Sequence, residues 1–109
     1  MKKLILMLIV GSLFAVETQT VEIINITKES KVEVYTALFW KPCKEAKELL
    51  QSRGIDFDAK MVTFSRKKVE DMAKRTGGKS SVPQIFVDDK YFGGLEELIF
   101  YYKEKESCN

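Results

Sequence analysis

Residues 31–50 read K-V-E-V-Y-T-A-L-F-W-K-P-C-K-E-A-K-E-L-L, and this stretch decides the fold. Its first six residues alternate valine with charged residues, a period of two that predicts a β-strand. Its second half places Cys43, Ala46 and Leu50 on one helical face and charged residues on the other, which predicts an amphipathic helix. The folded part of the chain is therefore expected to begin with a strand that leads directly into a helix.

The same two periods continue downstream and predict five further elements. They are a strand over residues 57–62, a helix over 65–76 closed by Gly77, a hairpin made of 84–87 and 91–92, and a last amphipathic helix marked by 95–102. The order β-α-β-α-β-β-α predicts a small α/β domain with a central mixed four-stranded sheet. We expect a parallel strand pair in its first half and an antiparallel hairpin in its second.

The N-terminal residues predict a targeting segment. Lys2 and Lys3 precede thirteen uncharged, mostly apolar residues, and the first acidic residue is Glu17. As a helix this run is about 20 Å long, shorter than the roughly 30 Å apolar layer of a bilayer. We therefore expect a signal peptide over residues 1–15 and an exported protein, periplasmic in a bacterium, with an uncleaved membrane anchor as the alternative. Residues 16–30 either add an edge strand or simply lead into the domain.

The composition limits the chemistry of the domain, which we place at residues 31–105, with a tail at 106–109. The 109 residues are 45% hydrophobic and 31% charged, as in a single compact domain, and the net charge of +2 does not indicate nucleic acid as a partner. The chain has no histidine and only two cysteines, Cys43 and Cys108. Zinc sites need histidines or several cysteines, and Ser-His-Asp triads need a histidine, so we expect no metal and no bound cofactor.

Three separated stretches resemble the glutaredoxins, a family of the thioredoxin-like superfamily. Residues 32–50 are similar to the family's strand, C-x-x-C loop and first helix. Residues 81–87, S-V-P-Q-I-F-V, resemble its T-V-P-Q-I-F-I signature, and residues 93–98, G-G-L-E-E-L, resemble its G-G-x-D-D-L. The resemblance implies a thioredoxin-like fold and thiol–disulfide exchange with glutathione as a co-substrate.

This chain departs from the family pattern at the C-x-x-C loop. Cys43 matches the second cysteine of that motif, and Trp40 stands where the first, nucleophilic cysteine belongs. Turnover through the first sulfur is therefore excluded, and so is the iron–sulfur ligation that the family performs through it. The helix start and the neighbouring Lys41 and Lys44 favour a thiolate at Cys43, whereas a position facing the core disfavours it. A weakly reactive thiol and a half-buried structural thiol both remain open.

The resemblance also implies a binding site for glutathione or for an extended cysteine-containing peptide. In the family, a cis-proline turn pairs with the ligand backbone, and the first N–H groups of the last helix receive a carboxylate. Glutamate replaces the usual aspartate in that helix start, and nearby lysines either meet a second carboxylate or form a solvated rim. The residues expected to contact the ligand are Trp40, Lys41 or Lys44, Ser81, Val82, Pro83, Gly94, Leu95 and Glu96.

Two functions follow from these observations. The first is a glutaredoxin-like thiol–disulfide oxidoreductase that acts on glutathione or a thiol-bearing protein through Cys43. The second is a redox-inactive binding module of the same fold, in which Trp40 covers the groove or stacks on a partner. We expect Cys108 to be a tail thiol, since the last helix carries it away from the active-site end, and we expect Asp88 and Asp89 to serve only the hairpin turn.

Overall fold

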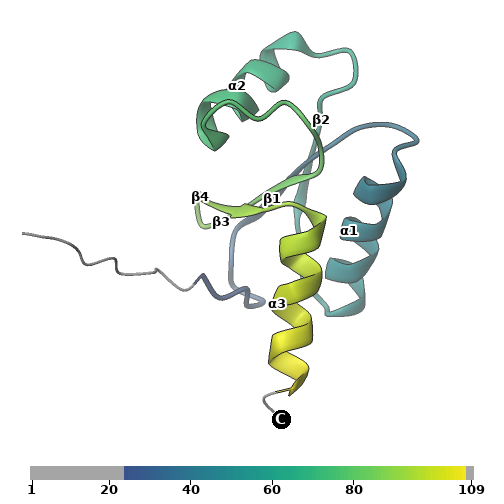
Figure 1. The fold of residues 1–109 in the computed structure, drawn as a ribbon, viewed down its shortest axis with the longest axis vertical. Helices are drawn as coiled ribbons and strands as arrows, with labels where there is room; N and C mark the ends of the chain where they lie inside the picture. Colours follow the sequence, from purple (N-terminus) through teal and green to yellow (C-terminus); the bar gives the residue numbers. More distant parts are fainter. Residues whose placement is uncertain (1–23, 108–109) are drawn as a thin grey trace, which may run out of the picture.

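The structure is a computed structural model that describes residues 24–107 (Figure 1). The predicted signal peptide and Cys108 lie outside the described residues. Of the lead-in, residues 24–30 are described, and they contain no strand. None of the helices within 24–107 has the length and apolar composition that crossing a membrane requires.

Seven elements follow one another in the predicted order. They are β1 (Val32–Thr36), α1 (Lys41–Ser52), β2 (Asp58–Met61), α2 (Arg66–Thr76), β3 (Gln84–Val87), β4 (Lys90–Gly93) and α3 (Leu95–Ser107). The differences from the predicted bounds are small: Phe57 and Val62 flank β2 instead of belonging to it, and β4 begins at Lys90.

The four strands form one mixed sheet in the order β2-β1-β3-β4. β1 pairs in parallel with β2 and antiparallel with β3, and β3 pairs antiparallel with β4, which confirms the predicted arrangement. Every residue of β1 is buried. The alternation that predicted this strand therefore does not mark a solvent-facing side, because helices cover both faces of the sheet.

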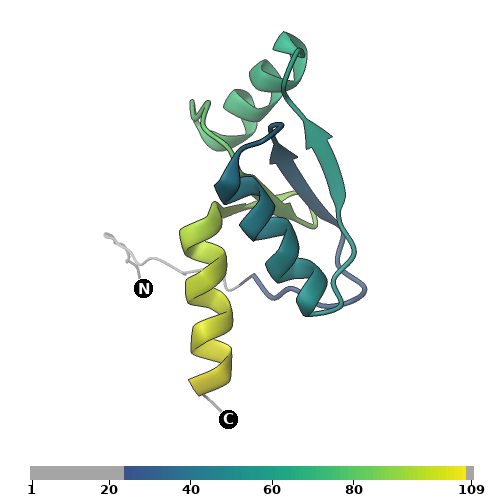
Figure 2. The same cartoon turned by 90° about the vertical axis from the view of Figure 1, so that its right-hand side faces the viewer.

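The sheet separates two hydrophobic cores, one under the helices on each of its faces. α1 and α3 lie side by side on one face of the sheet, and α2 lies on the other (Figures 1 and 2). The larger core contains Ile26, Val32, Val34, Ala46, Leu50, Ile55, Ile85, Val87, Leu98 and Tyr102. The smaller core contains Tyr35, Met72 and Phe86. Ile26 shows that the lead-in packs against the domain.

The hairpin between β3 and β4 turns at Asp88 and Asp89, as predicted. Both residues have positive φ, 51° and 68°, the conformation of a two-residue turn that matches the twist of the strands. These aspartates do more than form the turn. Asp88 Oδ1 accepts from Lys31 N at 2.8 Å, Asp88 N donates to Lys31 O at 2.8 Å, and Asp89 pairs with Lys31 Nζ at 3.3 Å. The hairpin is thus held by hydrogen bonds and an ion pair to Lys31, the residue before β1.

Candidate functional site

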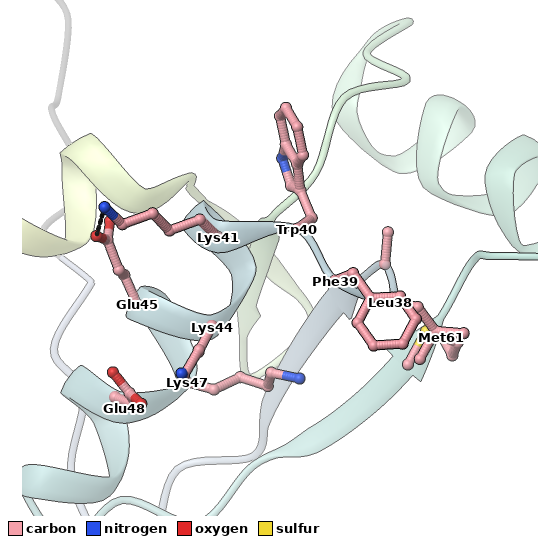
Figure 3. Close-up of a pocket in the computed structure, with 10 residues that line it drawn as sticks. Leu38, Phe39, Trp40, Lys41, Lys44, Glu45, Lys47, Glu48 and Met61 are labelled. Carbon is pink, nitrogen blue, oxygen red and sulfur yellow. Dashed lines mark ion pairs between the residues drawn. The ribbon is translucent and has the colours of Figure 1, made fainter.

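Trp40 stands at the start of α1 and reaches across to the loop before β3. It is the N-cap residue of the helix, with an extended backbone, and its carbonyl accepts from Cys43 N at 3.0 Å. Its ring is 52% exposed and points away from the lysines of α1 (Figure 3). The indole Nε1 donates to Val82 O at 2.9 Å. The residue in the place of the family's first cysteine therefore already donates a hydrogen bond to the carbonyl oxygen of the expected binding turn.

The Val82-Pro83 peptide bond is cis, as the resemblance implied. The turn lies against the start of α3, because a Cβ atom added at Gly94 would come within 3.1 Å of Pro83 O. Ser81 is exposed, and its carbonyl accepts from Gln84 Nε2 at 3.0 Å, which anchors the loop to β3. The structure thus brings together Trp40, Val82, Pro83 and Gly94 from three separate stretches of sequence.

The start of α3 is already capped by a side chain of its own helix. Glu97 Oε1 accepts from Gly94 N at 2.7 Å. We expected the N–H groups at this helix start to receive a ligand carboxylate, but that of Gly94 is already bonded. Glu97 is the third residue of the helix and Gly94 precedes the first, which is the reciprocal half of a capping box. Glu97 was not among the predicted site residues, although its spacing of three from Gly94 is the signal for this contact. Glu96 is exposed, and Leu95 packs against the larger core.

Cys43 faces the core. It is the third residue of α1, its side chain is only 1% exposed, and it shares the inner face of the helix with Ala46 and Leu50. The burial is deeper than the half-buried position that the spacing predicted. A thiol enclosed in this way cannot meet a disulfide in solution unless the first turn of α1 opens. The structure therefore supports the structural interpretation of this cysteine over the reactive one.

The lysines of α1 line a different hollow from the binding turn. A cavity of about 640 Å³ lies between the outer face of α1, the loop before it and Met61 of β2 (Figure 3). Lys41, Lys44 and Lys47 line it together with Trp40, and neither Val82 nor Gly94 does. Lys41 pairs with Glu45 at 3.9 Å on the exposed helix surface. Trp40, which also bonds to Val82 O, therefore stands between this cavity and the binding turn.

The possible metal-ligating side chains of the described residues do not form a metal centre. Within the part of the chain that the structure describes, no three side chains of His, Cys, Asp or Glu lie close enough to hold an ion. The chemistry available at Trp40, Val82 and Gly94 is hydrogen bonding and aromatic contact.

Comparisons with known proteins agree on the family. The family model described as glutaredoxin matches residues 32–92. Glutaredoxin 3 of Escherichia coli (strain K12) is 39% identical over 69 residues, which cover 63% of this chain and 82% of that protein. Glutaredoxin 1 of Rickettsia conorii is 36% identical over 72 residues, covering 65% of this chain and 71% of that protein.

Solved structures give the same result. The crystal structure of glutaredoxin 1 from Francisella tularensis, complexed with cacodylate, has a TM-score of 0.59 and 28% identity, and the match covers 72% of this chain and 98% of that one. A buckwheat glutaredoxin–glutathione complex has a TM-score of 0.63 over 72% of this chain and 73% of its own. At 16% identity the buckwheat structure bears on the fold alone.

Proposed function

Because the chain belongs to the glutaredoxin family, we propose that it is a redox-inactive binding module of that fold, which takes up a cysteine-containing peptide or glutathione at the Val82-Pro83 turn. The observation that carries this proposal is the 2.9 Å hydrogen bond from Trp40 Nε1 to Val82 O. An extended ligand pairs with this turn through its own backbone N–H. The indole N–H holds that position, so a ligand binds by displacing Trp40.

The displacement has a moderate cost. The indole exchanges one neutral hydrogen bond for contact with water, and such a bond contributes about 1 kcal/mol net. Trp40 is already 52% exposed, so its movement can uncover only the remaining half of its surface. Once displaced, the ring is placed to stack on the ligand, a contact that suits the flat, amphipathic indole. Trp40 thus lowers the affinity of the turn moderately without closing it.

The start of α3 favours a cationic peptide over glutathione. It carries Glu96 and Glu97, and Glu97 already accepts from Gly94 N. These glutamates oppose a ligand carboxylate and attract a ligand cation. The γ-glutamyl end of glutathione brings both an ammonium and a carboxylate, whereas a cationic side chain on a peptide brings only the favourable charge.

Thiol–disulfide exchange through Cys43 is the second candidate. It is favoured by the position of Cys43 in the first turn of α1, where no acidic residue opposes a thiolate. The Cys43 thiolate would attack the glutathione sulfur of a mixed disulfide and release the protein thiolate. A glutathione thiolate would then attack the new disulfide, regenerating Cys43 and forming oxidised glutathione. The 1% exposure of Cys43 weighs against this reaction.

The two candidates are separated by calorimetric titration with reduced glutathione and with a cationic cysteine-containing peptide. We expect the peptide to bind more tightly, and Trp40→Phe, which keeps a ring but loses the N–H donor, to bind it about fivefold more tightly than the wild type. Cys43→Ala should bind as the wild type does. Phe39→Leu is the matched control, because it changes a neighbouring exposed ring that does not contact Val82.

An enzymatic assay on the same variants completes the test. Reduction of a glutathione mixed disulfide should be absent in the wild type and should appear in Trp40→Cys, which restores the family's first cysteine. Turnover that is present in the wild type and lost in Cys43→Ala would establish the second candidate instead. Failure of every variant to bind either ligand would rule out the binding module.

A further inference from the structure

The loops before α1 and α2 present three apolar side chains at one end of the molecule. Leu38, Phe39 and Phe64 are 47%, 100% and 95% exposed, and we call them the apolar tip. The two loops are joined, because Leu38 N donates to Thr63 Oγ1 at 3.0 Å. Both phenylalanines have left-handed backbones, with φ of 56° and 68°. The rings therefore project outward from a fixed platform and pack on nothing in the described chain.

Basic side chains surround the apolar tip. Neither α1 nor α2 has an acidic residue in its first turn. The cavity beside Phe39 is lined by three lysines against two glutamates, and three consecutive exposed basic residues follow Phe64 and Ser65. The six basic residues are Lys41, Lys44, Lys47, Arg66, Lys67 and Lys68. An apolar centre with a cationic rim is complementary to a surface that is anionic outside and apolar within.

We propose that the apolar tip inserts into the surface of an anionic lipid membrane. Phe39 and Phe64 would enter the boundary between headgroups and acyl chains, and the basic rim would lie among the lipid phosphates. Long lysine and arginine side chains can remain at the headgroups while the rings lie deeper. This role is separate from ligand binding at the Val82-Pro83 turn.

The exposure of the two rings favours a membrane over an acidic protein. Phe39 and Phe64 are almost fully exposed and stand on separate loops, so a folded partner would need two pockets at matching positions. A lipid interface deforms around any such pair. The predicted N-terminal segment acts in the same direction, because a signal peptide and an uncleaved anchor both bring the chain to a membrane.

The test uses Trp40, the single tryptophan of the full chain, as a local reporter beside Phe39. Vesicles of phosphatidylglycerol with brominated acyl chains should quench its emission, whereas brominated phosphatidylcholine vesicles should quench it weakly. The double variant Phe39→Ser/Phe64→Ser should lose most of the quenching. Lys67→Gln/Lys68→Gln should require roughly 25-fold more anionic lipid, since each of the two cations near such a surface contributes about one factor of five. Phe100→Ser on α3, which replaces a 63% exposed ring, should behave as the wild type.

Two results would overturn the proposal. Equal quenching in the wild type and in Phe39→Ser/Phe64→Ser would show that the N-terminal segment alone brings the chain to lipid. No quenching by anionic vesicles, together with a Trp40 emission shift on adding soluble acidic polypeptide, would assign the tip to a protein partner. Circular dichroism checks that the exposed serine substitutions leave the fold intact. The peptide titration is unaffected by either outcome.

Discussion

Trp40 and Cys43 differ sharply in exposure: the position that matches the family's first cysteine holds a half-exposed tryptophan, and the remaining thiol is enclosed. Helical spacing was enough to predict which face Cys43 occupies, because it depends only on residues three and four apart. The contact of Trp40 with Val82 could not be predicted in this way. It joins residues 42 positions apart and depends on how two loops meet.

Two adjacent tyrosines of α3 should respond in opposite ways to loss of the hydroxyl. Tyr101 OH accepts from Ile26 N at 2.9 Å, whereas the buried Tyr102 OH has no hydrogen-bond partner among the described residues. We expect Tyr101→Phe to lower the free energy of unfolding by about 1 kcal/mol. Tyr102→Phe should leave it unchanged or raise it by up to about 1 kcal/mol, because an unsatisfied buried hydroxyl is removed. Urea denaturation of both variants measures the difference, and equal losses would contradict it.

At the scale of elements, the sequence was sufficient where one local signal determines the result. Gly77 ends α2 as predicted, with φ +76°. Ser65, predicted as the first residue of the helix, is its N-cap instead, and its Oγ accepts from Lys68 N. The role of Glu97 was missed because the G-G-L-E-E-L stretch was interpreted through its resemblance, as a site that receives a ligand. The same residues satisfy a simpler capping rule, in which the third helical residue bonds back to the N-cap.

The glycines that end elements differ in what surrounds them, and this predicts different costs of substitution. At Gly93, φ is +138° and an added Cβ would lie 2.6 Å from Glu97 Cγ, whereas at Gly77, φ is +76° and nothing lies within 4 Å. We expect Gly93→Ala to destabilise the protein by about 2–4 kcal/mol, from backbone conformation and displacement of the Glu97 cap together. Gly77→Ala should cost about 1 kcal/mol from conformation alone. Thermal and urea unfolding would refute this if the two costs were equal.

At the scale of the whole molecule, one buried carboxylate links β1, β2 and α2 on the face of the sheet that α2 covers. Glu33 of β1 is 5% exposed and pairs with Arg75 of α2 at 2.9 Å and with Lys60 of β2 at 3.6 Å. The alternation in residues 31–36 would place Glu33 towards solvent. It is buried because α2, whose Arg75 lies 42 residues later, covers that face, and no local pattern in β1 contains this information. The sequence therefore predicted the order and pairing of the elements better than the polar contacts between them.

The decrease in the free energy of unfolding at high pH should come from titratable groups in different parts of the domain. A side-chain hydrogen bond with Asp58 is the main cause that raises the pKa of Lys60 above 10.5, and burial raises the pKa of Tyr91 and Tyr102 above 10.0. Each group holds its proton more tightly in the folded state, so its contribution is complete below its ordinary pKa and is lost as pH rises above it.

The free energy of unfolding should therefore show no loss from these groups between about pH 7 and pH 9.5, and should fall as pH rises from about 10 to 11.5. Urea titrations at a series of pH values measure this dependence. Tyr102→Phe should make the fall shallower, and so should Lys60→Met after allowance for its lower starting stability. Lys67→Met, at an exposed position in the first turn of α2, is the matched control and should leave the slope unchanged. A free energy that stays constant or rises above pH 10 would show that Tyr91, Tyr102 and Lys60 are not held as the structure describes.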